Sequence, residues 1–115
     1  VTTKLPLTEK LEGILQDSDQ ELAQFLYQVT RKGAAFDRSH DLGGLILNDP
    51  LTIAYLLDPS IVELRDAEIE IETTGERCGA SNVRFVDSSR CKVGYDVDYE
   101  KFYKLIFDRI LNIQL

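Results

Sequence analysis

Residues 48–59 read NDPLTIAYLLDP, and this stretch contains both the start and the end of a helix. Asp49 is a favoured N-cap residue, and Pro50 suits the first helical position because proline lacks the amide hydrogen that is unpaired there. Apolar residues recur at helical spacing after Pro50, and Asp58-Pro59 disfavours continuation of the helix. The stretch therefore predicts a short helix between Asp49 and Asp58.

The chain before this helix predicts two further helices and a long loop. Residues 8–15 carry apolar side chains on one side of a short helix. Ser18 and Glu21 have the spacing of a capping box, and the amphipathic helix that follows is expected to end at Gly33. Residues 34–47 show no helical stripe, and a loop of this length in a compact domain is usually functional or mobile.

The pattern of apolar residues changes after the central helix from helical spacing to alternation. Residues 68–72 alternate glutamate with isoleucine, which predicts a strand with one buried face and one wet face. Residues 83–86 and 92–95 indicate two further strands, and Asp98 is expected to cap a long closing helix. The predicted fold class is α/β, with helices, a small antiparallel sheet and a closing helix. The first helices have apolar faces without a parallel sheet to cover, which indicates a missing layer.

Composition limits the classes of function. The chain has 115 residues and is treated as a single partial domain over residues 1–115. Its net charge is −7, which argues against nucleic acid and anionic membranes as partners. No apolar run reaches the ~20 residues that a membrane span requires. Cys78 and Cys91 are expected to be reduced thiols of a cytoplasmic protein, with a single disulfide between hairpin strands as the alternative.

Few residues carry chemistry when they are judged by residue type alone. Asp49 at a helix N-terminus is suited to bind calcium, but it is equally suited to cap its own helix, which is the default interpretation. Asn48 has the same default role as a capping residue. His40 is the only imidazole of the chain, and a lone histidine in a loop is more often solvated than catalytic.

Several blocks of the sequence together resemble the inosine-uridine-preferring nucleoside hydrolases. Residues 48–59 are similar to a family hallmark of His-Asp-Pro, an apolar stretch with Ala-Tyr, and a closing Asp-Pro. Residues 69–76 resemble a family strand and turn, and residues 93–98 followed by Phe102 resemble its closing strand and last helix. Residues 1–4 are similar to the segment before the helix that precedes the mobile loop. The resemblance covers nearly the whole chain but only the C-terminal part of a family member.

The resemblance implies an open α/β fold and a specific reaction. Family members cleave the N-glycosidic bond of ribonucleosides to ribose and free base, with a role in nucleoside salvage, and a calcium ion binds the ribose hydroxyls and the attacking water. Asp49 matches a calcium ligand of the family. Residues 34–47 match its active-site lid, with Phe36, Arg38 and His40 as candidate substrate contacts.

Two departures from the family pattern modify this expectation. Position 48 is Asn where the family usually has a histidine that helps to protonate a departing purine, and an amide donates a hydrogen bond but transfers no proton. Asn48 and His40 are therefore the catalytic candidates, and we expect poor turnover of purine nucleosides. The family's Asp-rich calcium signature is absent from these residues, so the chain alone is expected to be inactive and to bind calcium weakly.

Two other interpretations stay open at this stage. The chain could be a non-catalytic α/β module that keeps the family architecture for protein interaction or oligomerisation. It could also be a generic acidic domain, if the block-by-block similarity arose by chance. Helix faces that would pack against a sheet in a larger domain would be exposed here. Association in solution, either as a homo-oligomer or with the missing segment, is therefore expected on the enzyme and module interpretations.

Overall fold

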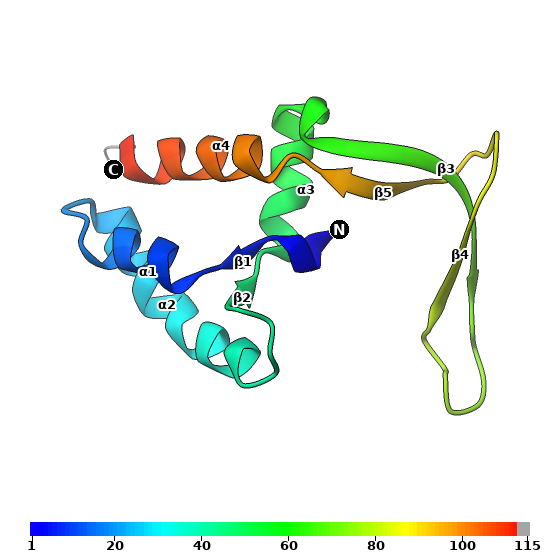
Figure 1. The fold of residues 1–115 in the computed structure, drawn as a ribbon, viewed down its shortest axis with the longest axis horizontal. Coiled ribbons are helices and arrows are strands. Elements are labelled where there is room, and N and C mark those ends of the chain that lie inside the picture. The colour runs from blue at the N-terminus through cyan, green and yellow to red at the C-terminus, as the bar shows by residue number, and fades with distance from the viewer. Residues whose placement is uncertain (113–115) are drawn as a thin grey trace. The chain divides into compact units, whose positions relative to one another are not determined.

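The computed structural model describes residues 1–112, which form two compact units (Figure 1). Unit 1 joins Val1–Ile61 to the chain from Val97 onward, and unit 2 is Val62–Asp96. The expected single partial domain stays a prediction. No helix in residues 1–112 is long and apolar enough to cross a membrane.

Unit 1 is mostly helical and contains one pair of very short strands. β1 pairs with β2 in antiparallel register, with Pro6 opposite Ile46 and Leu7 opposite Leu45. This pairing joins the start of the chain to the segment directly before the central helix. The elements of unit 1 are the 3-10 helix Thr2–Lys4, β1 (Pro6–Leu7), α1 (Glu9–Gln16), α2 (Glu21–Arg38), β2 (Leu45–Ile46), α3 (Asn48–Leu57), the 3-10 helix Pro59–Ile61 and α4 (Tyr99–Asn112).

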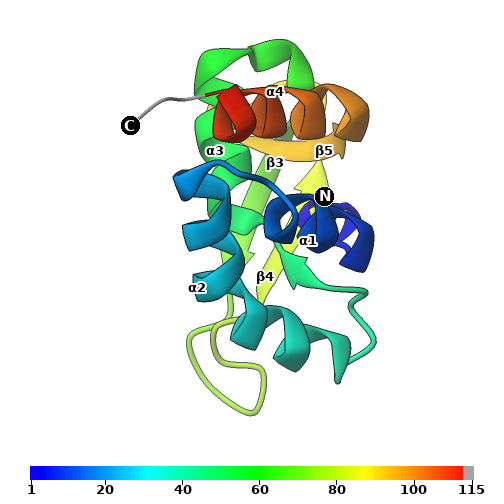
Figure 2. The same cartoon turned by 90° about the vertical axis from the view of Figure 1, so that its left-hand side faces the viewer.

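The helices of unit 1 enclose a small hydrophobic core. α1 packs against α2, and α4 packs against both α2 and α3 (Figure 2). Leu7, Leu15, Ala23 and Phe107 form the buried cluster between them. The Tyr103 hydroxyl of α4 donates to the carbonyl oxygen of Pro6 at 2.7 Å, and burial raises the pKa of this phenol. Helix α4 is therefore anchored to the β1 segment by apolar packing and by one hydrogen bond.

Both predicted ends of α2 are wrong. The helix continues past Gly33 to Arg38, and Gly33 packs closely against Leu45, since a Cβ there would lie 2.9 Å from a Leu45 methyl group. The capping box is also absent. The Ser18 hydroxyl accepts from the Gln20 amide at 3.1 Å, so it stabilises a turn, and the helix begins only at Glu21.

The predictions for α3 and α4 hold better. Helix α4 begins after Asp98, whose carboxylate accepts from the Lys101 amide at 3.0 Å, as a cap should. Helix α3 ends at Leu57 before Asp58, and hydrogen bonds from Ser60 lower the pKa of the Asp58 carboxyl. The helix begins two residues earlier than expected, at Asn48 instead of Pro50.

Unit 2 is a three-stranded sheet in the order β4-β3-β5, from β3 (Val62–Ile71), β4 (Ser81–Phe85) and β5 (Lys92–Val97). All three predicted strands are confirmed, and β3 pairs with β4 in antiparallel register. The expected burial of one face of β3 is wrong, because Ile69 and Ile71 are 45% and 50% exposed. Their strand has the predicted alternation, but no layer of unit 2 covers its apolar side.

We expect unit 2 to lose stability in acid through Asp66. A hydrogen bond from Lys92 and a second from the Ser89 amide, at 3.2 Å, lower the pKa of the Asp66 carboxyl. A lowered folded-state pKa stabilises the fold above the ordinary aspartate pKa of about 3.9, and this stabilisation is lost as the pH falls through the folded-state value. Amide NMR shifts of unit 2, recorded from pH 5 to pH 2, should therefore report its unfolding in acid.

The Asp66→Asn variant should flatten that acid transition and should be less stable near neutral pH. Asp87→Asn is the matched control, because Asp87 lies in the connection between β4 and β5, near Ser89, but makes no side-chain hydrogen bond within residues 1–112. An Asp66→Asn protein with the acid transition of the unmodified chain would show that this carboxylate does not stabilise unit 2.

Candidate active site

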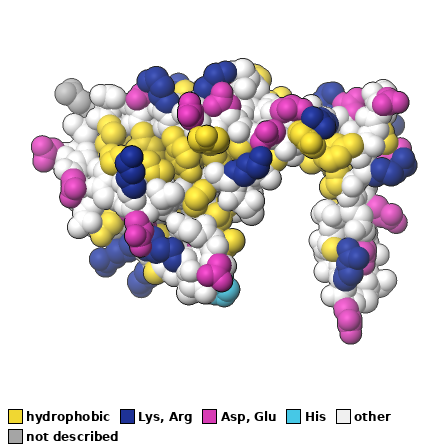
Figure 3. Space-filling model, viewed as in Figure 1, with side chains coloured by type: hydrophobic (Ala, Val, Ile, Leu, Met, Phe, Trp, Pro, Cys, Tyr) yellow, Lys and Arg dark blue, Asp and Glu magenta, His cyan; other side chains and the backbone are white. Residues whose placement is uncertain are grey.

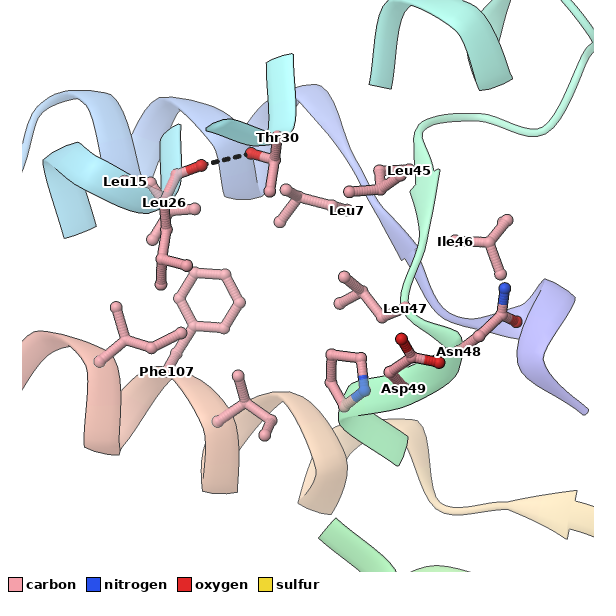
Figure 4. Close-up of a pocket in the computed structure, with 13 residues that line it drawn as sticks. Leu7, Leu15, Leu26, Thr30, Leu45, Ile46, Leu47, Asn48, Asp49 and Phe107 are labelled. Atoms are coloured by element: carbon pink, nitrogen blue, oxygen red, sulfur yellow. Dashed lines mark hydrogen bonds between the residues drawn. The ribbon is translucent and has the colours of Figure 1, made fainter. Parts of the chain in front are cut away.

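A cavity of about 340 Å³ opens in unit 1 where α3 begins (Figure 4). Most of its wall is apolar, with Leu15, Leu26 and Phe107 at one end. The polar groups at the other end belong to Asn48 and Asp49, at the start of α3. Such a site, apolar with a few polar groups on one side, is typical of pockets for small ligands.

Asp49 does not cap its own helix. The residue at the N-cap position of α3 is Leu47, and Asp49 lies in the first helical turn. Only its backbone oxygen is engaged, by the Thr52 hydroxyl at 2.7 Å, while its exposed carboxylate has no hydrogen-bond partner among the described residues. The default capping interpretation of Asp49 is therefore wrong, and the carboxylate is free to bind a ligand at the cavity.

Asn48, like Asp49, does not cap α3. It is the first residue of α3, its side chain is exposed, and its amide makes no hydrogen bond within the described chain. The default capping interpretation of Asn48 is therefore also wrong. Asn48 and Asp49 both line the cavity, and Figure 4 shows the Asn48 amide turned toward Ile46 and away from the Asp49 carboxylate. The site thus offers an amide that can donate and a carboxylate that can accept.

The short strands hold this pair in place. The Leu47 amide donates to the Leu5 carbonyl oxygen at 3.0 Å, directly before Asn48. One residue earlier, the Ile46 amide donates to the Asp37 carboxylate at 3.1 Å. The start of α3 is thus tied both to the N-terminal segment and to the end of α2, which fixes where its first two side chains point.

The structure places the three candidate lid contacts apart from this pair. Phe36 and Arg38 lie in the last turns of α2, His40 follows the helix, and none of the three lines the cavity. The rings of Phe36 and His40 stack with centroids 4.4 Å apart, and Nδ1 of His40 lies 2.9 Å from the Phe36 carbonyl oxygen. Arg38 pairs with Glu12, with 2.6 Å between Nη1 and Oε2. Their assigned roles stay predictions.

The predicted lid loop is shorter than residues 34–47. Its first five residues continue α2, and β2 occupies its end, so residues 39–44 form the irregular part. Asp41 and Gly43 adopt left-handed backbone conformations there, with φ of 61° and 74°. The role of this segment as a lid over a substrate stays a prediction.

Sequence reasoning missed Glu12. This residue of α1 is buried, its Oε2 pairs with Arg38, and its Oε1 has no hydrogen-bond partner in the described structure. A signal was present, because Glu12 lies between Leu11 and Leu15 on the predicted apolar side of the helix. A charged residue at such a position indicates a buried partner, which here is the end of α2.

The described residues supply only part of a metal site. Carboxylate and amide oxygens such as those of Asp49 and Asn48 suit a hard cation, and calcium takes six to eight oxygen ligands. Within residues 1–112, no group of three or more His, Cys, Asp or Glu side chains could hold a metal ion. The donor type therefore fits calcium, and the larger part of a coordination shell would have to come from elsewhere.

Comparisons with known proteins agree with the resemblance. A family model described as inosine-uridine preferring nucleoside hydrolase matches residues 1–104. The chain is 34% identical to a probable ribonucleoside hydrolase of Dictyostelium discoideum over 71 residues, which are 57% of this chain and 21% of that protein. It is 26% identical to an inosine-uridine preferring nucleoside hydrolase of Leishmania major over 83 residues, which are 68% of this chain and 26% of that protein.

Solved structures show the same relationship at the level of the fold. The structure matches a plant nucleoside hydrolase, the PpNRh1 enzyme, with a TM-score of 0.84 and 23% identity. The match covers 98% of this chain and 39% of the plant chain. The α/β fold class is thereby confirmed, and the chain spans well under half the length of these relatives.

Proposed function

Because this chain belongs to the inosine-uridine preferring nucleoside hydrolase family, we propose that it is part of a longer hydrolase of ribonucleosides. That longer protein, the parent, would cleave the N-glycosidic bond with water and release ribose and a free base. The observation that carries the proposal is the carboxylate of Asp49, which lies unpartnered at the cavity instead of capping its helix. It stands at the position that matches the family's calcium ligand.

The proposed chemistry divides between this chain and the remainder of the parent. Calcium, when bound, would polarise the ribose hydroxyls and the attacking water. Asp49 would contribute one ligand to that ion, and the remaining oxygens would come from outside the described residues. The apolar wall around Phe107 would exclude water from the sugar and the base.

A product assay of the parent tests this function directly. Uridine and inosine should each give free ribose and free base in phosphate-free buffer containing calcium. The 115-residue chain alone should give neither product, because it supplies only part of the metal site. Release of ribose phosphate in place of ribose, and only when phosphate is added, would contradict hydrolysis and indicate phosphorolysis.

We predict that Asn48 sets the preference for the leaving base. Its amide can donate a hydrogen bond to a departing base, but it cannot supply the proton that a purine needs. The Asn48→His variant of the parent should therefore raise kcat/KM for inosine relative to uridine by roughly 100-fold, at the lower end of the 10²- to 10⁴-fold range of general acid catalysis. Steady-state assays on both nucleosides give this ratio.

His40 provides the control for this prediction. The His40 ring contacts Ser39 and Phe36 and does not line the cavity. His40→Ala tests whether this imidazole, the only one of the chain, supplies the proton that Asn48 cannot. A parent that turns over inosine and uridine equally well, and keeps doing so as Asn48→Ala and as His40→Ala, would contradict the proposed role of position 48.

Self-association is a second proposal, and it covers the case in which the chain acts as a non-catalytic module. Helix α3 buries Leu51 and Ala54 on one side and exposes apolar residues on the other, with Ile53, Leu56 and Leu57 at 54%, 75% and 52%. Figure 3 shows hydrophobic side chains gathered over much of the visible face of unit 1. Apolar surface on this scale is typical of protein interaction sites.

A cytoplasmic location stays part of the proposal. Cys78 and Cys91 are both free and exposed, which suits a reducing compartment. Nucleoside salvage is the physiological role that fits the proposed hydrolysis, since the free base can be reused.

A further inference from the structure

Asp37, in the last turn of α2, ties the end of this helix to β2. The residue is half-buried, and its carboxylate accepts a hydrogen bond from the Ile46 amide at 3.1 Å. Its backbone oxygen accepts from the amides of His40 and Leu42, at 3.0 and 3.1 Å. One residue therefore holds both the first turn of the irregular segment 39–44 and the strand that follows this segment.

The Ile46 amide points away from the other short strand. Pro6 of β1 lies opposite Ile46 in the register. The hydrogen bond from the Leu47 amide to the Leu5 carbonyl oxygen flanks this pair. An antiparallel pair that is flanked in this way exchanges no hydrogen bonds of its own, so the Ile46 N–H is directed away from β1. Without Asp37, this backbone donor would have to be satisfied by water.

The helix end to which Asp37 attaches β2 is itself anchored. Arg38, the next residue of α2, pairs with Glu12 of α1, with 2.6 Å between Nη1 and Oε2. The Glu12 side chain is only 10% exposed, and separating a buried ion pair is costly because it leaves a charge without its partner. Helices α1 and α2 also pack against each other. Asp37 therefore connects β2 to a fixed part of unit 1.

We propose that Asp37 is a positioning residue for Asn48 and Asp49. Asp37 does not line the cavity, so it acts through the backbone: its carboxylate fixes Ile46, which lies two residues before Asn48. A group that binds metal or substrate must be held close to its productive geometry, and a misplacement of about 1 Å can cost roughly 10²-fold in rate. This inference rests on the proposed hydrolysis and adds to it a residue that touches neither substrate nor metal.

Two substitutions separate the hydrogen bond of Asp37 from its negative charge. Asp37→Leu removes the acceptor at similar size, whereas Asp37→Asn removes the charge but keeps an oxygen that can accept from the Ile46 amide. At saturating calcium, kcat/KM of the parent for uridine should fall roughly 10- to 100-fold in Asp37→Leu. Asp37→Asn should stay within about three-fold of the unmodified parent, because its amide oxygen replaces the carboxylate as acceptor.

The rates must be measured on folded protein. Unfolding curves identify a temperature at which both variants are folded, so that a loss of global stability alone does not lower the rates measured there. Full activity of folded Asp37→Leu would overturn the inference. Equal losses in the two variants would also overturn it, because they would show that the charge of Asp37 matters and its hydrogen bond does not.

A second measurement needs neither a variant nor turnover, and it covers the case in which Asp37→Leu does not fold. Hydrogen exchange of the parent, followed by NMR, should show the Ile46 amide protected at least about 10-fold against exchange with solvent. An Ile46 amide that exchanges as fast as in an unfolded chain would overturn the inference, even in an active parent. A parent that hydrolyses no nucleoside would contradict the proposed function, whereas a protected Ile46 amide would still support the positioning of the start of α3 by Asp37.

Discussion

Replacing Asp49 with alanine is expected to lower kcat/KM of the parent for uridine and inosine by on the order of 10³-fold, or about 4 kcal/mol of transition-state stabilisation. The carboxylate lies at the cavity without a hydrogen-bond partner in the described chain, so the variant removes no contact that holds the fold. The loss should therefore come from the metal and the sugar that Asp49 would bind. Initial-rate assays, with unfolding curves recorded in parallel, separate a loss of catalysis from a loss of stability.

Asp58→Asn is the control for this variant. Asp58 follows the other end of the same helix, where it accepts a hydrogen bond from the Ser60 amide at 3.0 Å and does not line the cavity. It should cost some stability and leave the rate of hydrolysis unchanged. Full activity of Asp49→Ala at saturating calcium would remove Asp49 from the mechanism.

The largest expected loss of stability belongs to Gly44→Ala. Gly44 has φ of 148°, and a Cβ at this position would lie 2.1 Å from the Leu7 carbonyl oxygen. That oxygen belongs to the backbone of β1 and cannot rotate away, so β1 and β2 would have to separate. Backbone strain of ~1–2 kcal/mol and overpacking of ~1–3 kcal/mol together predict a loss of about 3–4 kcal/mol. Urea unfolding of the 115-residue chain, followed by circular dichroism, measures this loss.

Gly43→Ala is the matched control in the same turn. Gly43 also has a positive φ, 74°, but the nearest atoms to its Cβ would be those of Pro6 at 4.0 Å. It should therefore show only the backbone strain, about 1–2 kcal/mol. Equal losses for the two variants would mean that the contact between Gly44 and Leu7 does not constrain the fold.

Local signals in the sequence were sufficient for much of the fold. The Asp58-Pro59 helix end, the Asp98 cap and the three strands each depend on a few neighbouring residues, and the structure has them where they were predicted. The end of α2 failed for a physical reason. Glycine is a common residue at a helix end, but Gly33 lies inside α2, where the Leu45 side chain of β2 packs against it. A sequence pattern does not contain that contact.

In the candidate site, too, the sequence predicted some features and could not predict others. The sequence identified Asp49 but could not decide between a cap and a ligand, because both roles use the same residue type at the same place. The structure excludes the cap, because the hydrogen bond from the Leu47 amide to the Leu5 carbonyl oxygen fixes the entry into α3 and leaves Leu47 at the N-cap position. The ligand role of Asp49 stays a proposal. Arg38 pairs with the buried Glu12, a contact that the sequence did not indicate, and its contact with substrate stays a prediction.

Calorimetric titration with calcium tests the role of Asp49 most directly. Three samples are needed: the parent, its Asp49→Ala variant and the 115-residue chain. We expect the parent to bind one calcium ion tightly, the variant to bind it at least about 100-fold more weakly, and the chain alone to show no tight binding. Tight one-to-one binding by the chain alone, or unchanged affinity in the variant, would contradict the proposal that Asp49 completes a calcium site built mainly by the rest of the parent.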